Sequence, residues 1–113
     1  MWFEPERAVE GTKLTVENPE FFLRKTMDDG THHRYYLLNL GNEAAFEYCL
    51  NMLSEIIEKI NVKCYRQDFN FSPLEYWREN DKENRCGITE IKHIMGLYRL
   101  WDARLERFPD LII

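Results

Sequence analysis

The sequence predicts an α/β fold in which short parallel strands alternate with amphipathic helices. Residues 43–60 and 89–108 carry apolar side chains at the spacing of helices that bury one face. Between them, residues 62–69 have the apolar character of a strand and end in polar side chains. This order predicts a βαβαβ run in which residues 62–69 form the middle strand. The carboxyl ends of parallel strands are the usual place for functional residues in such folds.

The N-terminal residues 1–6 read as the end of a strand. Pro5 closes it, because proline has no amide hydrogen to donate to a central ladder. Residues 9–33 show weak periodicity, so we expect at most a short helix there, and a turn at residues 28–30. Residues 35–40 are apolar and predict a brief extended segment.

The first long helix is predicted at residues 43–60. Asn42 can cap its free amides, and Asn61 suits the left-handed position that follows a helix. The expected buried stripe consists of Phe46, Cys49, Leu50, Leu53, Ile56, Ile57 and Ile60.

Residues 71–87 form a connection longer than usual, and such loops are functional or folded on themselves. Tyr76 and Trp77 either flank a bound substrate by stacking or pin this loop to the body of the protein, and we favour the second role. The second long helix, residues 89–108, should place its apolar stripe in the core, and residues 111–113 begin the next strand. That stripe consists of Ile91, Ile94, Met95, Tyr98, Trp101, Leu105 and Phe108.

The composition narrows the class of protein. A hydrophobic fraction of 44% and an aromatic fraction of 14% are enough for a packed core. The net charge of −5 argues against a nucleic-acid partner, which requires a basic surface. There is no apolar run of about 18 residues and no signal-peptide pattern, so no membrane partner is expected. The apolar ends, residues 1–3 and 111–113, resemble cut strands, so we expect an internal piece of a larger fold.

The cysteines and histidines predict no metal site. Cys49, Cys64 and Cys86 lack metal spacing and are odd in number, so we expect buried free thiols and a reducing, cytoplasmic compartment. His32 and His33 have no third ligand near them and are expected in a solvated loop. No metal and no cofactor is assigned.

A candidate site lies at the end of the middle strand. Asp68 follows Arg66 by two residues, so both should lie on one face, and Asn70 continues that face. A carboxylate beside a cation stays ionised, which suits a nucleophile better than a general acid. Taken alone, an Asp at a strand end is more often a turn or cap residue. Glu4 and Glu6, at the end of the first strand, should open onto the same edge.

Five short motifs together resemble glycoside hydrolase family 36, the α-galactosidases, across nearly the whole chain. They are residues 2–6 (WFEPE), 65–70 (YRQDFN), 87–90 (GITE), 96–98 (GLY) and 107–110 (RFPD). The resemblance implies that the chain, residues 1–113, is part of a (β/α)8 TIM-barrel catalytic domain, covering about strands three to five.

By the same resemblance, Asp68 is the catalytic nucleophile and Trp2 is a wall of the galactose subsite. Arg66 takes the place of a sugar-binding lysine, and Asn70 is the matching asparagine. Arg66 and Gln67 depart from the lysine and tryptophan of the family signature. For Glu4 and Glu6, helix capping or a salt bridge behind the site is the expected role.

The implied reaction is retaining hydrolysis of terminal α-galactosides, with two carboxylates about 5 Å apart. The acid/base of the family belongs to strand six, so this chain alone is expected to be inactive. The expected partner is an α-galactoside oligosaccharide, and a homo-oligomer is one option for the intact enzyme. The alternatives are an α-N-acetylgalactosaminidase, an α-galactosyl transglycosylase, or a non-catalytic α/β interaction fragment in which Asp68 only caps a loop.

Overall fold

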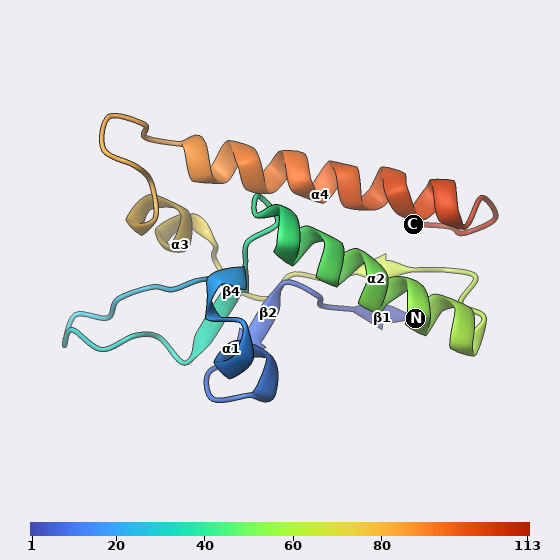
Figure 1. Cartoon of the computed structure of the whole chain (residues 1–113), viewed down its shortest axis with the longest axis horizontal. Coiled ribbons are helices and arrows are strands. Elements are labelled where there is room, and N and C mark those ends of the chain that lie inside the picture. Colours follow the sequence, from blue (N-terminus) through green and yellow to red (C-terminus); the bar gives the residue numbers. More distant parts are fainter.

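The computed structural model describes all 113 residues, with two long helices beside a short parallel sheet and a small antiparallel sheet next to them (Figure 1). Strand β1 (Trp2–Phe3) pairs in parallel with β5 (Arg66–Gln67). A parallel bridge joins Cys64 to Ile112 on the other side of the β5 segment. The parallel orientation predicted for these segments is confirmed.

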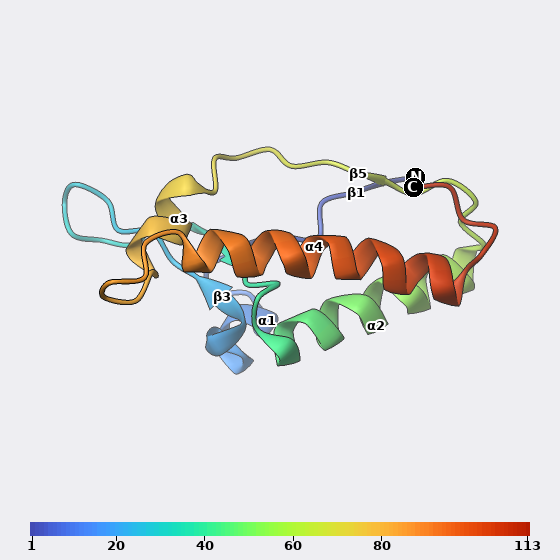
Figure 2. The same cartoon turned by 90° about the horizontal axis from the view of Figure 1, so that it is seen from above.

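The strands are much shorter than predicted. Residues 62–69 were expected to form one strand, but only Arg66–Gln67 are assigned to β5, and residues 111–113 contribute a single bridge. The pairing of β5 with β1 is short because β1 ends before Pro5, which has no amide hydrogen to donate to the next hydrogen bond between the two strands. Figure 2 shows both termini at the same end of the molecule, beside β1 and β5.

The segment between β1 and the first long helix contains an antiparallel sheet that the sequence analysis missed. Its strand order is β2–β4–β3, formed by Arg7–Val9, Tyr35–Leu38 and Phe22–Leu23. A short helix α1 (Lys13–Glu17) and a 3-10 turn η1 (Pro19–Phe21) connect β2 to β3. The helices in residues 9–33 are short, as expected, but β2 and β3 were not predicted, because strands of two or three residues are too short to show a period of two.

The predicted turn at residues 28–30 is confirmed. Gly30 has a φ of +83°, which side-chain-bearing residues rarely adopt, and Asp29 Oδ1 accepts hydrogen bonds from the amide and hydroxyl of Thr31. The turn closes the long β3–β4 connection at the left of Figure 1.

Helix α2 (Glu43–Ile60) has the predicted bounds and caps. Asn42 Oδ1 accepts from the amide of Ala45 at 3.1 Å, and Asn61 adopts the left-handed conformation with φ 53°. Phe46, Cys49, Leu50, Leu53 and Ile57 are buried in the main core, whereas Ile60 at the end of the helix is exposed. The amphipathic pattern therefore predicts this helix correctly, because its apolar stripe and its buried face coincide.

Helix α4 (Ile88–Arg107) exists as predicted, but its buried face differs from the predicted apolar stripe. Ile91, Met95, Tyr98 and Leu105 are between 41% and 61% exposed, and Trp101 is half-buried. The buried positions are Thr89, His93, Gly96, Leu100 and Arg104. Placing Tyr98 and Trp101 in the core was therefore wrong. Four of these five positions are a glycine and three polar residues, whose burial a hydrophobicity pattern does not register.

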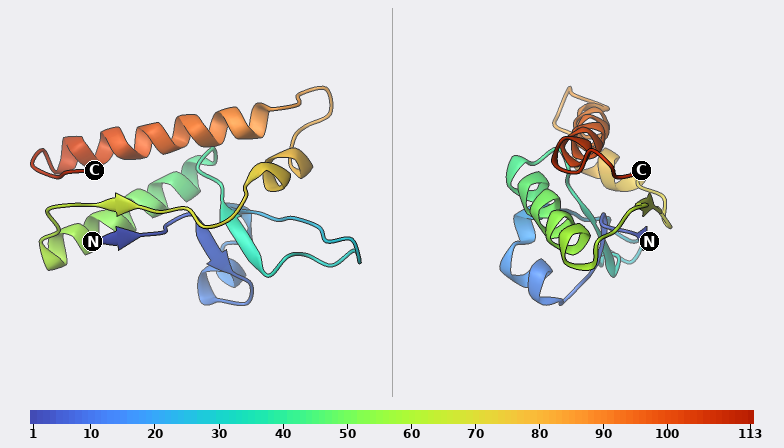
Figure 3. Two further views of the ribbon diagram at one scale, coloured as in Figure 1. Left: turned by 180° about the vertical axis from the view of Figure 1, so that it is seen from behind. Right: turned by 90° about the vertical axis from the view of Figure 1, so that its right-hand side faces the viewer.

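Helices α2 and α4 lie on the same side of the parallel sheet, as the end view in Figure 3 shows. The connection from β5 to α4 contains helix α3 (Leu74–Glu79). Tyr76 and Trp77 on this helix are buried against Leu23 and Leu37, so they pin the connection to the antiparallel sheet as expected. No helix has both the length and the apolar composition needed to cross a membrane.

Candidate functional site

The parallel register brings Trp2 and Arg66 together on neighbouring strands. They are direct partners in the pairing of β1 with β5. The guanidinium carbon of Arg66 lies 3.9 Å from the centre of the Trp2 ring, a cation–π stack, and both side chains are exposed. This arrangement presents an aromatic face and a cationic donor side by side.

Asp68 and Asn70 lie just beyond the end of β5 and connect to the end of β1. The amide of Asp68 donates to the carbonyl of Phe3 at 2.8 Å. Asn70 Nδ2 donates to Asp68 Oδ2 at 3.2 Å, and the Asn70 amide donates to Glu4 Oε1 at 3.2 Å. Glu4 also pairs with Arg7 at 2.5 Å. The two polar clusters predicted at one edge of the sheet are therefore in contact, and Glu4 forms the salt bridge that was expected.

Arg66 and Asp68, which were expected side by side on one face of the strand, do not form an ion pair. The side chain of Arg66 stacks on Trp2, and Asp68 forms no ion pair with any residue. The Asp68 carboxylate instead accepts from neutral donors, Asn70 Nδ2 and the amide of Phe69 at 3.0 Å. Sharing one face of a strand was not sufficient, because the larger aromatic surface of Trp2 is directly opposite Arg66.

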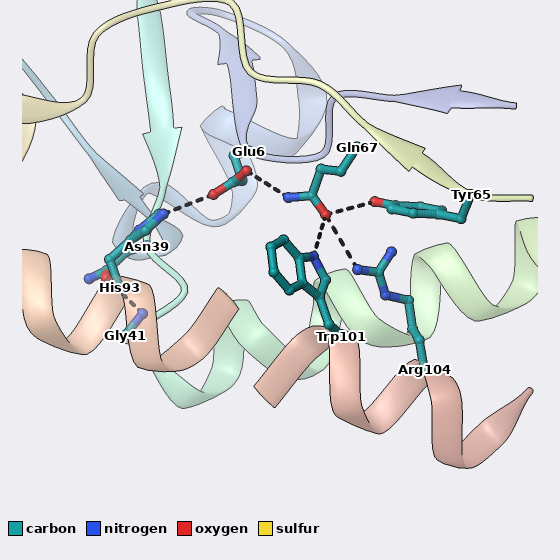
Figure 4. A network of polar contacts seen from close by, with 8 residues as sticks. All are labelled: Glu6, Asn39, Gly41, Tyr65, Gln67, His93, Trp101 and Arg104. Atoms are coloured by element: carbon teal, nitrogen blue, oxygen red, sulfur yellow. Dashed lines mark hydrogen bonds and ion pairs between the residues drawn. The ribbon is translucent and has the colours of Figure 1, made fainter. Parts of the chain in front are cut away.

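A buried polar network lies on the helix side of the same strands (Figure 4). Glu6, which is 3% exposed, accepts from His93 Nε2 at 2.8 Å and from Gln67 Nε2 at 2.8 Å. A carboxylate can only accept, so His93 donates through Nε2 in this pair. Gln67 Oε1 in turn faces Trp101 and Arg104 on α4.

A cavity of about 290 Å³ is lined by residues of this network, by the segment after β5 and by Trp77 of helix α3, whose ring packs on His93. Asp68 and Glu6 contribute carboxylates to its lining, and Trp77, His93 and Trp101 contribute aromatic rings. Asp68 therefore borders a cavity whose lining combines aromatic rings with a second carboxylate, Glu6, which is already hydrogen-bonded to Gln67 and His93.

The remaining reactive groups do not add to the site. No three His, Cys, Asp or Glu side chains are grouped so that they could hold a metal ion. Cys49 is buried, and burial raises the pKa of its thiol to about 12. Cys64 and Cys86 are exposed, so the expectation of buried thiols is wrong for both. His33 is half-buried, with Nδ1 3.2 Å from the hydroxyl of Tyr76, and so is not in a fully solvated loop.

Comparison with known proteins identifies the family. The sequence profile described as melibiase matches residues 1–113, which is the whole chain. The chain belongs to the melibiase family. Two relatives of this chain are the probable alpha-galactosidase C of Aspergillus flavus, 29% identical, and alpha-galactosidase AgaA of Geobacillus stearothermophilus, 23% identical. Each match covers 99% of this chain but only 14% and 16% of the relative, so the chain spans about a seventh of their length.

Solved structures of melibiase relatives share the fold. AgaB from Geobacillus stearothermophilus, a family 36 α-galactosidase, superposes with a TM-score of 0.79 at 21% identity. The α-galactosidase from Lactobacillus brevis gives a TM-score of 0.77, also at 21% identity. Both comparisons cover 97% of this chain and 15% of the other. The chain is therefore an α/β segment similar to family 36 structures.

Sequence reasoning missed the buried polar network. His93 and Arg104 interrupt an apolar pattern, and Gln67 departs from a signature, so the sequence alone assigns none of them a role. A signal was available, since His93 and Arg104 are 11 residues apart, about three helical turns, and so share a face of α4. Polar residues that recur on one helix face indicate partners on the neighbouring element.

Proposed function

We propose that this chain supplies the nucleophile side of the active site in a retaining α-galactosidase. In this proposal, residues 1–113 cover about strands three to five of a (β/α)8 barrel. The observation that carries the proposal is the parallel register of β1 and β5. It brings two family motifs to one edge of the sheet. There the Arg66 guanidinium stacks on Trp2, and the Asn70 amide donates to Glu4 Oε1. The carboxyl ends of barrel strands are where such enzymes place their catalytic residues.

Asp68 acts as the nucleophile in this proposal. Its carboxylate attacks the anomeric carbon, the glycosidic oxygen leaves as an acid/base elsewhere in the enzyme protonates it, and water then hydrolyses the glycosyl ester. The hydrogen bond from Asn70 Nδ2 to Asp68 Oδ2 supports this role, because it fixes one oxygen and leaves the other carboxylate oxygen with only a backbone donor. The carboxylate is about half-buried at the border of the cavity, where a sugar ring can approach it.

Trp2 and Arg66 recognise the sugar in this proposal. The exposed indole face provides a platform for the apolar face of a galactose ring, and the guanidinium donates to its hydroxyl groups. Crystal structures of variants of AgaA from Geobacillus stearothermophilus have been obtained with stachyose and with raffinose. We propose α-galactoside oligosaccharides of this kind as the substrates of the enzyme that contains this chain.

The test is hydrolysis of an activated aryl α-galactoside by the full-length enzyme that contains this chain. Asp68→Ala should lower kcat by several orders of magnitude, because the nucleophile acts in the transition state. Azide should then restore turnover and give the β-azide, since a small anion can attack from the space that the carboxylate leaves. The matched control is Asp29→Ala, a carboxylate in the exposed turn of residues 28–30, which should retain full activity. Activity of Asp68→Ala within a few-fold of the unmodified enzyme would leave Asp68 with a loop-capping role only.

A further inference from the structure

We infer that Gln67 is a positioning residue for the reaction: its side-chain amide fixes the end of β5, and with it the side chains of Arg66 and Asp68. This inference rests on the proposed function. Gln67 lies between those two residues in the chain, and the side chains of successive strand residues leave on opposite faces. Restraining Gln67 on the helix side therefore restrains the strand that presents Arg66 on the other.

The amide of Gln67 makes four hydrogen bonds. Its Nε2 donates to Glu6 Oε2 at 2.8 Å. Its Oε1 accepts from the hydroxyl of Tyr65 at 3.1 Å, from Trp101 Nε1 at 3.1 Å and from an Nη atom of Arg104 at 3.3 Å. These partners come from three places: the segment after β1, the β5 segment itself, and helix α4. One planar group thus ties the two strands to the helix that covers them (Figure 4).

The charges around Gln67 explain why an amide is needed. Arg104 is fully buried, its guanidinium lies 3.9 Å from the centre of the Tyr65 ring, and its Nε donates to the carbonyl of Leu100. Glu6 is also buried and faces His93. The amide of Gln67 connects the acidic group to the basic group with its donor end toward the carboxylate and its acceptor end toward the guanidinium. An aligned chain of this kind is stronger than its separate bonds and is costly to break.

The position of Gln67 is also where this chain departs from the family signature, which has tryptophan there. An indole has one donor and no acceptor, so it could not accept from Tyr65, Trp101 and Arg104. The partners on α4 are therefore matched to glutamine in this chain.

A reciprocal exchange of Glu6 and Gln67 tests the inference. Gln67→Glu places two carboxylates against each other, and Glu6→Gln places two amide donors against each other. Each single variant should therefore misplace the reacting groups and lower kcat roughly 10- to 100-fold. The double variant reverses the donor and acceptor but keeps every contact, since the new Gln at position 6 still accepts from His93. It should recover most of the lost kcat. Recovery specific to the pair distinguishes positioning from a general loss of stability.

The assay uses the full-length enzyme and an aryl α-galactoside, with kcat, KM and the melting temperature measured for each variant. Ser54→Ala is the matched control, because it removes hydrogen bonds to the Leu50 carbonyl and from Arg107, neither of which involves a residue of this network, and should change only the melting temperature. An active unmodified enzyme whose single variants keep their kcat, or whose double variant recovers nothing, would overturn the positioning role. An unmodified enzyme with no α-galactosidase activity would instead contradict the proposed function.

A spectroscopic measurement on the 113-residue chain is independent of activity. The indole proton of Trp101 should exchange slowly with solvent, because it donates to Gln67 Oε1 in a half-buried position. Gln67→Ala should shift this resonance and accelerate its exchange, while the Ser54→Ala control should leave it in place. An unchanged Trp101 resonance in folded Gln67→Ala would show that the bond is not formed and would remove the basis of the inference.

Discussion

The guanidinium of Arg66 stacks on the indole of Trp2, 3.9 Å from the ring centre, at the position where β1 and β5 are in direct register. The stack fixes a flexible cation in a fork geometry that suits neighbouring sugar hydroxyls. It also orients an indole that is 62% exposed and would otherwise be free to rotate. Each residue therefore limits the conformations of the other.

Loss of Arg66 should weaken substrate binding. In the full-length enzyme, Arg66→Ala should raise KM for an aryl α-galactoside by an amount equivalent to about 1.5–3 kcal/mol, the usual contribution of a charge-assisted hydrogen bond. Arg66→Lys keeps the charge but not the planar stack, so its effect should be smaller. Steady-state kinetics of both variants measure this. Equal KM values for Arg66→Ala and the unmodified enzyme would exclude Arg66 from sugar binding.

Gly96 determines how closely α4 approaches the chain before α2. A Cβ added at this position would lie 2.1 Å from the carbonyl oxygen of Leu40. Alanine favours a helix by about 1 kcal/mol over glycine, but the backbone clash is larger, so Gly96→Ala should lower the free energy of unfolding by about 1–3 kcal/mol. Chemical denaturation checks this, with Asp102→Ala on the exposed side of α4 as the control. A more stable Gly96→Ala would mean that α4 does not pack this closely.

The difference between α2 and α4 shows what the sequence could predict. In α2 the apolar stripe and the buried face coincide, so periodicity and the caps at Asn42 and Asn61 were sufficient. In α4 the contact face includes Gly96, which allows close packing because it has no side chain. It also includes polar groups whose burial depends on partners that are distant in the sequence. Such partners are set by tertiary structure and leave no local pattern.

The candidate site divides in the same way. Motif order and strand alternation predicted that Trp2, Arg66, Asp68 and Asn70 would gather at one edge, and the contacts of Trp2 with Arg66 and of Asp68 with Asn70 agree with this. Arg66 stacks on Trp2 and forms no ion pair with Asp68. Which of these two neighbours Arg66 contacts depends on their relative interaction energies, and residue spacing does not describe those.

Asp81 should make the stability of the fold sensitive to acid. Its carboxylate accepts from the amides of Gly87 at 2.7 Å and Thr89 at 2.9 Å, at the start of α4. The hydrogen bond from the Gly87 amide has the largest effect, followed by those from the amide and side chain of Thr89. Together they hold the pKa of Asp81 below its usual value. Because the pKa of Asp81 is lower in the folded chain than in the unfolded chain, its charge stabilises the fold at pH values above the unfolded-state pKa of about 3.9. That stabilisation is lost as the pH falls through the pKa of the folded chain.

The unmodified chain should therefore lose more stability than Asp81→Asn as the pH is lowered from about 5 to about 3, on either side of the unfolded value. Denaturant titrations of both proteins at several pH values measure the difference. Parallel pH profiles would contradict a role for the Asp81 charge at this helix start.

The thiols should differ in reactivity. Cys49 is fully buried, and burial raises its pKa to about 12, so almost no thiolate forms at neutral pH. Cys64 and Cys86 are exposed. An alkylating reagent at neutral pH should add to these two residues in the folded chain and to Cys49 only after unfolding, as intact mass and peptide mapping would show. Rapid modification of Cys49 without denaturant would contradict the packing of α2.

The central claim is that Asp68 is the nucleophile of a retaining α-galactosidase. A fluorinated α-galactosyl fluoride tests it most directly, because the fluorine substituent slows hydrolysis of the glycosyl ester so that the covalent intermediate accumulates. The full-length enzyme that contains this chain is incubated with the reagent, digested and sequenced by mass spectrometry. We predict one galactosyl group attached to the Asp68 carboxylate and none in Asp68→Ala. A glycosyl group on a different residue, or labelling that persists in Asp68→Ala, would contradict the account.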